Sequence, residues 1–231
     1  MSESLQPAPA ATRRIPLAVK VVFTAFVAVL VPFYWKAYGP TNFLYFCDVA
    51  LLLTLVAVWT EHPLPAGMAA VGITVPQMLW VADFLAVLCG GQITGMTAYM
   101  FDPGIPLSAR VLSLFHGWLP FLLLYLVCRL GYDRRSPIAW TVLASGLMLV
   151  CYFLMPPPPA PAAVPGQTNP PVNINYVYGP GDANPQHWMP PLAWLGLLLA
   201  ALPLAFYLPA HFFLRWLAAR CGSRVVGEPA A

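Results

Sequence analysis

Six stretches of about 20 mostly apolar residues constrain the fold of this chain more than any other feature of its sequence. The hydrocarbon core of a bilayer is about 30 Å thick, which roughly 20 helical residues can cross. Backbone polar groups in lipid must be satisfied internally, so these stretches predict helices and exclude open sheets. The predicted spans are Ile15–Trp35, Asn42–Trp59, Leu64–Gly90, Leu107–Leu130, Pro137–Met155 and Leu192–Trp216.

The composition agrees with a membrane protein and excludes other classes. Of the 231 residues, 60% are hydrophobic and 8% are charged, whereas soluble domains average about 25% charged residues. The net charge of +3 comes from scattered residues, while a nucleic-acid surface needs clustered cations. We therefore expect an all-α, polytopic membrane helix bundle, and we expect neither a soluble enzyme nor a nucleic-acid partner.

The basic residues predict an orientation, because cytoplasmic loops are enriched in lysine and arginine. Six spans place both termini on one side, together with nine of the eleven basic residues. Only Lys36 and Arg110 fall on the other side. This bias predicts cytoplasmic termini (N-in, C-in). The expected organisation is an N-terminal tail at 1–14, a transmembrane domain at 15–216 and a C-terminal tail at 217–231.

Two segments on the predicted outer side, 91–106 and 156–191, are too polar or too rich in proline to span. The first suits an interfacial or re-entrant segment covered by protein. The second begins with four prolines, which favour extended polyproline conformation. Its later part is consistent with an exposed loop carrying interfacial aromatics or with a flap folded over the outer mouth of the bundle. The candidate loop residues are Asp102, Asn173, Asn175 and Tyr176.

The five cysteines contain no C-x-x-C pair, so their spacing indicates neither a disulfide framework nor a structural zinc site. Most of them are expected to be small packing residues. Haem ligation would need paired histidines at one depth, and only His116 lies at the candidate depth. We predict no metal and no cofactor.

Ionisable side chains within the spans point to a candidate site, because such groups are costly in lipid and are usually turned inward. At 1.5 Å per residue, Cys47 and Asp48 lie roughly 8–9 Å from the outer helix ends, Asp83 roughly 10 Å and His116 roughly 13 Å. Three helices therefore contribute to one layer in the outer half of the membrane. The expected supporting polar residues are Asn42, Arg110 and Ser113.

This layer admits three interpretations. Cys47 and His116 could form a nucleophile and base, with a carboxylate orienting the imidazole. Alternatively, Asp48, Asp83 and His116 could form a buried hydrogen-bond network that holds three helices together. The same acids could also serve a proton or small-solute pathway. The sequence leaves open whether the chain is an enzyme or a non-catalytic module.

Four segments resemble an uncharacterised family of bacterial multi-span membrane proteins: Tyr38–Asp48 (YGPTNFLYFCD), Thr97–Pro103, Ser113–His116 and Asn173–Gly181. The resemblance covers most of the chain and implies a bacterial inner membrane location. A more distant similarity is to multi-span lipid hydrolases and acyltransferases of the androgen-induced-gene type. Cys47 and His116 match their nucleophile and histidine in order. That similarity implies lipid-acyl chemistry and membrane lipid as the partner.

Overall fold

The computed structural model describes residues 15–160, 170–181 and 184–227. Within these ranges the chain is an all-α bundle, as predicted. Its α-helices are α1 (Leu17–Tyr38), α2 (Phe46–Thr60), α3 (Pro63–Leu88), α4 (Leu107–Ser113), α5 (Phe115–Leu130), α6 (Ser136–Leu154), α7 (Pro191–Leu202) and α8 (Leu208–Arg220). The short elements are η1 (Pro40–Leu44), η2 (Ala98–Met100), η3 (Ile174–Tyr176), the π-turn η4 (Pro203–Tyr207), β1 (Tyr132–Asp133) and β2 (Val225–Val226).

Five helical segments of the described chain are long and apolar enough to cross a membrane. Two are composite: α4 continues into α5, and α7 continues through η4 into α8. The predicted second span differs from the others. Its α-helix begins at Phe46 instead of Asn42 and has 15 residues, because Pro40–Leu44 forms a separate 3-10 turn.

Helix α3 lies at the centre of the bundle and packs against α2, α5, α6 and α8. Small residues allow this close packing, as is usual between helices in lipid. A Cβ atom at Gly67 would overlap the Ser136 hydroxyl, and one at Gly72 would overlap the Trp140 indole. Glycine at these two positions therefore fixes the close approach of α3 and α6.

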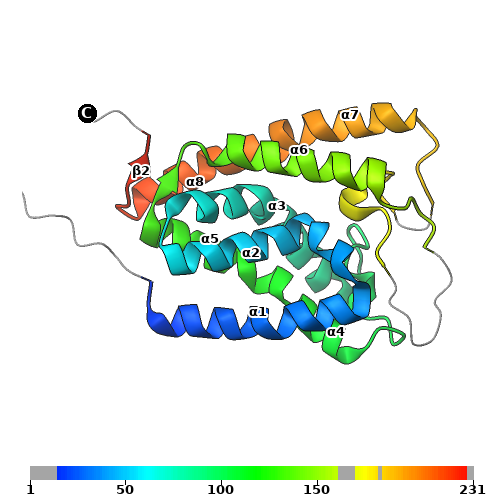
Figure 1. Cartoon of the computed structure of the whole chain (residues 1–231), viewed down its shortest axis with the longest axis horizontal. Coiled ribbons are helices and arrows are strands. Elements are labelled where there is room, and N and C mark those ends of the chain that lie inside the picture. The colour runs from blue at the N-terminus through cyan, green and yellow to red at the C-terminus, as the bar shows by residue number, and fades with distance from the viewer. Residues whose placement is uncertain (1–14, 161–169, 182–183, 228–231) are drawn as a thin grey trace, which may run out of the picture.

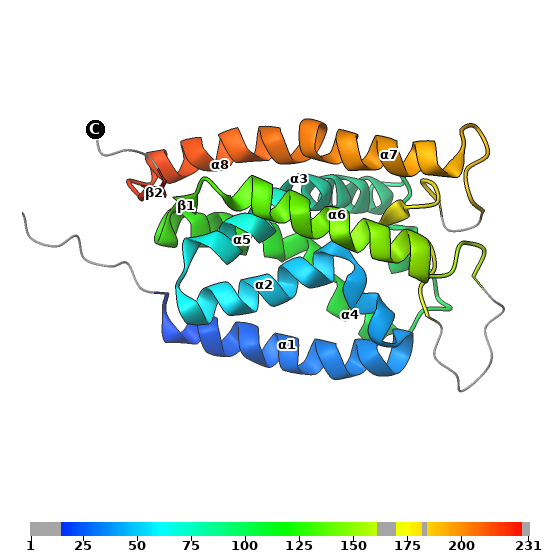
Figure 2. The ribbon, with the colours of Figure 1, turned by 45° about the horizontal axis from the view of Figure 1, so that its top comes forward.

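The connections gather at two ends of the bundle (Figures 1 and 2). The start of α1, the α2–α3 connection, β1 and β2 lie at one end, which we call the basic end. The opposite end, here the loop end, holds η1, residues 89–106 and the connection between α6 and α7. Helices α1 and α3 run from the basic end to the loop end, and α2 runs back between them.

The basic end is closed by contacts between β1 and the C-terminal segment. Strands β1 and β2 pair in parallel, with Tyr132 opposite Val225. A disulfide joins Cys128 at the end of α5 to Cys221 after α8. The sequence did not indicate this disulfide, because its cysteines are 93 residues apart and only the fold brings them together.

At the loop end, the later part of the second outer segment is folded onto the bundle. Val172, Ile174 and Val177 are buried. Asn175 acts as a distant cap for α2: its Oδ1 accepts from Phe46 N (2.9 Å) and its Nδ2 donates to Leu44 O (2.9 Å). Of the two interpretations of this segment, the described residues adopt the flap. We call residues 172–181 the outer flap.

Candidate functional site

Asp48 is the most deeply buried of the predicted site residues in the second span, with 2% of its surface exposed. It lies in the first turn of α2. Its Oδ2 accepts a hydrogen bond from Asn42 Nδ2 at 3.1 Å. Its Oδ1 is also buried and has no hydrogen-bond partner among the described residues. The site therefore contains a carboxyl oxygen with unused capacity to bind.

Three hydroxyl-bearing side chains from different elements lie near this carboxyl. The Tyr34 phenol of α1 is near enough to Asp48 to be influenced by its charge. It shares a 2.9 Å hydrogen bond with Ser113 Oγ. Ser113 also lies near the Tyr99 hydroxyl, where it offsets part of the rise in pKa that burial causes in that phenol. The Tyr99 hydroxyl accepts from Trp80 Nε1 at 3.3 Å. We call Tyr34, Ser113 and Tyr99 the hydroxyl row.

Tyr99 forms the outer end of the hydroxyl row. It lies in η2 outside the long helices and is half-buried. Burial raises the pKa of its phenol, so the hydroxyl keeps its proton at neutral pH. A protonated hydroxyl both donates and accepts hydrogen bonds. Tyr99 can therefore donate one hydrogen bond while it accepts another.

The two predicted catalytic residues lie on helices that pack together, α2 and α5. His116 Nδ1 donates to Ser113 O at 2.7 Å, and its ring stacks on Trp80 with centroids 5.4 Å apart. Cys47 is a half-buried free thiol. Among the described residues, no hydrogen bond joins Cys47 to His116. The structure gives the imidazole another partner, the Ser113 carbonyl.

Asp83 has a separate role that its depth did not reveal. Its Oδ1 accepts from the amides of Ile93 (3.0 Å), Thr94 (2.7 Å) and Gly95 (3.1 Å). Its Oδ2 accepts from the amide (3.0 Å) and the hydroxyl (2.7 Å) of Thr97. These five bonds fold the loop after α3 around one carboxylate. In the described chain none of them leads to Asp48 or His116.

The remaining candidates near this loop stabilise its backbone. Arg110 Nη1 donates to Met100 O at 3.2 Å. Asp102 is exposed, and its Oδ1 accepts from Gly104 N at 2.7 Å. Neither contact involves the Asp48 carboxyl, so these residues support the loop and not the buried site.

The candidates in the outer flap hold it in an unusual conformation. Asn173, Asn175 and Tyr176 have positive φ values of 51°, 58° and 60°, which L-residues other than asparagine and aspartate rarely adopt. Asn173 Nδ2 donates to Gly179 O (2.9 Å), and its Oδ1 accepts from Tyr178 N (2.8 Å). The backbone carbonyl of Tyr176 accepts from Trp194 Nε1 at 2.8 Å. These contacts hold the flap against the bundle.

Sequence reasoning did not assign Tyr34, Trp80 or Tyr99 to the site. Tyr34 lies next to the end of the first predicted span, Ile15–Trp35. Its contact with Ser113 joins residues 79 positions apart, and no local pattern indicates such a contact. Gln77 and Thr74 of α3 also carry buried polar side-chain atoms without partners in the described chain. Polarity in the middle of an apolar stretch was the signal available for them.

The described residues contain no group of three or more His, Cys, Asp or Glu side chains that could hold a metal ion. No protein-family model, curated protein or solved structure matches the chain. The structure itself defines the class: a helix bundle suited to a membrane, with a buried carboxyl and a hydroxyl row in one half.

Proposed function

We propose that this chain is a six-span protein of the bacterial inner membrane with both termini in the cytoplasm. Helices α1 and α3 run in the same direction (Figure 2), so the chain between them must return across the same thickness. Together η1 and α2 cover Pro40–Thr60, which supports a sixth crossing. The excess of basic residues at the basic end supports the orientation.

Two features of the basic end favour opposite compartments. The cation bias favours the cytoplasm, whereas a disulfide such as Cys128–Cys221 persists more readily in an oxidising compartment. C-terminal fusions decide between them. A fused green fluorescent protein should fluoresce and a fused alkaline phosphatase should be inactive. The reverse pattern would overturn the proposed orientation.

Within this topology, the function that the geometry supports best is a proton pathway that uses Asp48 as its buried acceptor. This proposal rests on Asp48, which is 2% exposed and whose Oδ1 has no partner in the described part of the chain. An ionisable group inside a membrane bundle costs about 2.5–3.5 kcal/mol or more, so such residues usually mark ion or proton routes. The hydroxyl row supplies the connection to the outer side.

In this proposal a proton enters at Tyr99, which is half-buried at the loop end. Each hydroxyl accepts a proton on its oxygen and releases its own to the next group. The last transfer, from Tyr34 to the Asp48 carboxylate, passes through a bridging water, because no direct hydrogen bond joins these two groups among the described residues. Release of the proton from Asp48 toward the basic end then completes the crossing. Asn42 donates to Oδ2, which leaves Oδ1 as the oxygen that takes up the proton.

The test is proton entry into proteoliposomes that contain a pH-sensitive dye and carry a potassium diffusion potential, negative inside. Wild-type protein should acidify the lumen faster than protein-free liposomes do. The Asp48→Asn variant should lose this entry, because an amide cannot accept and release the proton. Asp102→Asn, which changes an exposed acid, is the matched control and should behave as wild type. Equal rates in wild type and Asp48→Asn would overturn the proposal.

Lipid-acyl catalysis by Cys47 and His116 is the other candidate from the sequence. It requires the imidazole to take the thiol proton within hydrogen-bond reach or through one water. The bond from His116 Nδ1 to Ser113 O leaves only Nε2 for this task. A thiol-directed acyl probe should label Cys47 in the wild type and not in His116→Ala if the pair is catalytic. Equal labelling of both would exclude the pair.

A further inference from the structure

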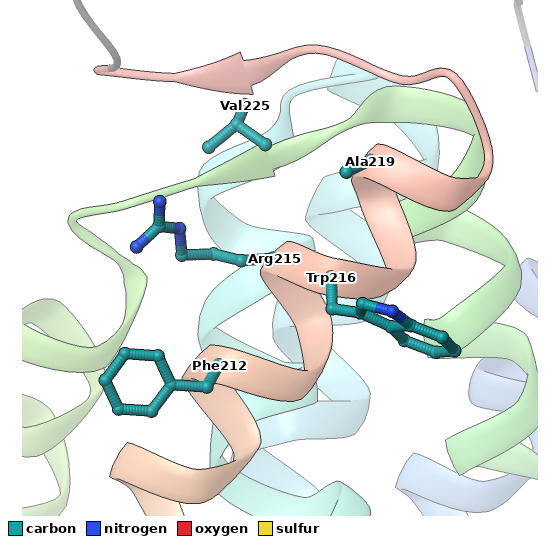
Figure 3. Close-up of a pocket in the computed structure, with 5 residues that line it drawn as sticks. All are labelled: Phe212, Arg215, Trp216, Ala219 and Val225. Atoms are coloured by element: carbon teal, nitrogen blue, oxygen red, sulfur yellow. The ribbon is translucent and has the colours of Figure 1, made fainter.

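A groove at the basic end lies apart from the proton site, on the surface of the last turns of α8. Its volume is about 300 Å³, and it is lined by Phe212, Arg215, Trp216, Ala219 and Val225. Figure 3 shows the Arg215 and Phe212 side chains extending to one side of α8, with Arg215 below β1 and β2, while the Trp216 ring extends to the other side. The groove therefore combines a guanidinium group with two aromatic rings.

The wall formed by Val225 is held in place by the fold. Val225 belongs to β2, which pairs with β1. Tyr132 N donates to Arg224 O at 3.0 Å, and Arg134 N donates to Val226 O at 3.2 Å. The Cys128–Cys221 disulfide fixes the start of this segment. The groove is thus bounded by an anchored strand on one side and by α8 on the other.

The charge around the groove is strongly positive. The described part of the basic end carries seven basic side chains and two acidic ones, Glu61 and Asp133. Both acids form salt bridges, with Lys20 at 2.6 Å and with Arg135 at 2.8 Å. The described part of the basic end therefore carries five more basic than acidic side chains. This excess is complementary to an anion.

The groove also lies where the headgroups of a bilayer would be. The segment Pro191–Arg220 has 30 residues and is about 45 Å long at 1.5 Å per residue, so it exceeds a hydrocarbon core of about 30 Å. Trp216 is 54% exposed near the end of this segment, and the Arg220 guanidinium lies 5.6 Å from its ring centroid. Exposed tryptophan beside arginine is typical of the membrane–water interface.

We propose that this groove binds the headgroup of an anionic glycerophospholipid. The Arg215 guanidinium contacts the phosphate, since its planar fork has five donors and suits that group. Arg220 and Arg224 add the field that favours a net negative headgroup over a zwitterionic one. Phe212 and Trp216 contact the glycerol and the first acyl carbons. The site does not depend on the proton pathway.

The test uses purified full-length protein in nanodiscs of phosphatidylcholine doped with a fluorescent phosphatidylglycerol or a fluorescent phosphatidylcholine. Energy transfer from tryptophan reports lipid near the protein. Wild type should favour phosphatidylglycerol, and Arg215→Gln should reduce this preference about fivefold, as expected for one basic residue at a membrane surface. Lys36→Gln, at the loop end, is the matched control and should keep the full preference.

Arg224→Gln provides a second variant in case Arg215→Gln does not fold, because Arg224 is exposed on the C-terminal segment. It should also lower the preference for phosphatidylglycerol. Equal association of the two lipids with wild type would overturn the proposal. Displacement of the fluorescent lipid by millimolar inorganic phosphate would also overturn it, because the groove would then be a site for soluble anions.

Discussion

The carboxylate of Asp83 should be the main organiser of the loop after α3, and Asp83→Asn tests this role. Asparagine keeps one acceptor oxygen, so the donors that bind the other carboxylate oxygen lose their partner. The loss is smaller if these are the two donors to Oδ2, the amide and the hydroxyl of Thr97, which is 0% exposed. A buried unsatisfied donor costs about 1–3 kcal/mol. We therefore expect the free energy of unfolding to fall by about 2–4 kcal/mol.

Thermal unfolding in detergent, followed by tryptophan fluorescence, measures this change. A loss of this size should lower the Tm by roughly 5–10 °C for a chain of this length. Hydrogen exchange should also quicken at the amides of residues 93–97. The control is Asp102→Asn, which changes an exposed acid with one hydrogen bond, to Gly104 N, and should cost less than about 0.5 kcal/mol. An Asp83→Asn variant as stable as wild type would refute this role.

Three further predictions concern packing, the flap and pH. Gly72→Ala should lower the free energy of unfolding by about 3 kcal/mol or more, because the new Cβ would overlap the buried Trp140 indole. Gly146→Ala, where the space is open, is the control and should be neutral or stabilising. Equal Tm values for the two variants would contradict this packing. Asn175→Ala should speed hydrogen exchange at the Phe46 amide, which loses its acceptor; unchanged exchange would show that the flap does not cap α2. The hydrogen bond from Arg135 lowers the pKa of Asp133, so this pair contributes its full stabilisation above pH about 4 and loses it progressively as the pH falls toward the lowered pKa. A Tm difference between wild type and Arg135→Gln that does not narrow as the pH falls below about 4 would contradict this.

The sequence predicted the helix bundle well, because the apolar stretches carry most of the information about a membrane fold. It was less accurate at the start of α2. There the partner of Phe46 N is Asn175, 129 residues away, so the end of the helix depends on a tertiary contact. The disulfide between Cys128 and Cys221 escaped prediction for the same reason.

For the candidate site, the sequence could indicate depth but not partners. Asp48 and Asp83 fall in the same predicted layer, yet one has an unused oxygen and the other has five donors. The difference comes from loop amides at residues 93–97, which no helical spacing shows. Tyr34 was missed because its partner Ser113 lies on another helix. Burial marks a residue as unusual, but its hydrogen bonds determine its role.

Infrared difference spectroscopy across a change of pH tests the proton-accepting role of Asp48 most directly. A carboxyl that gains and loses a proton changes its C=O stretching band, and isotopic substitution of water shifts that band. We predict a band of this kind in wild type that is absent from Asp48→Asn and retained in Asp102→Asn. The same carboxyl bands in wild type and Asp48→Asn would contradict the proposal that Asp48 exchanges protons.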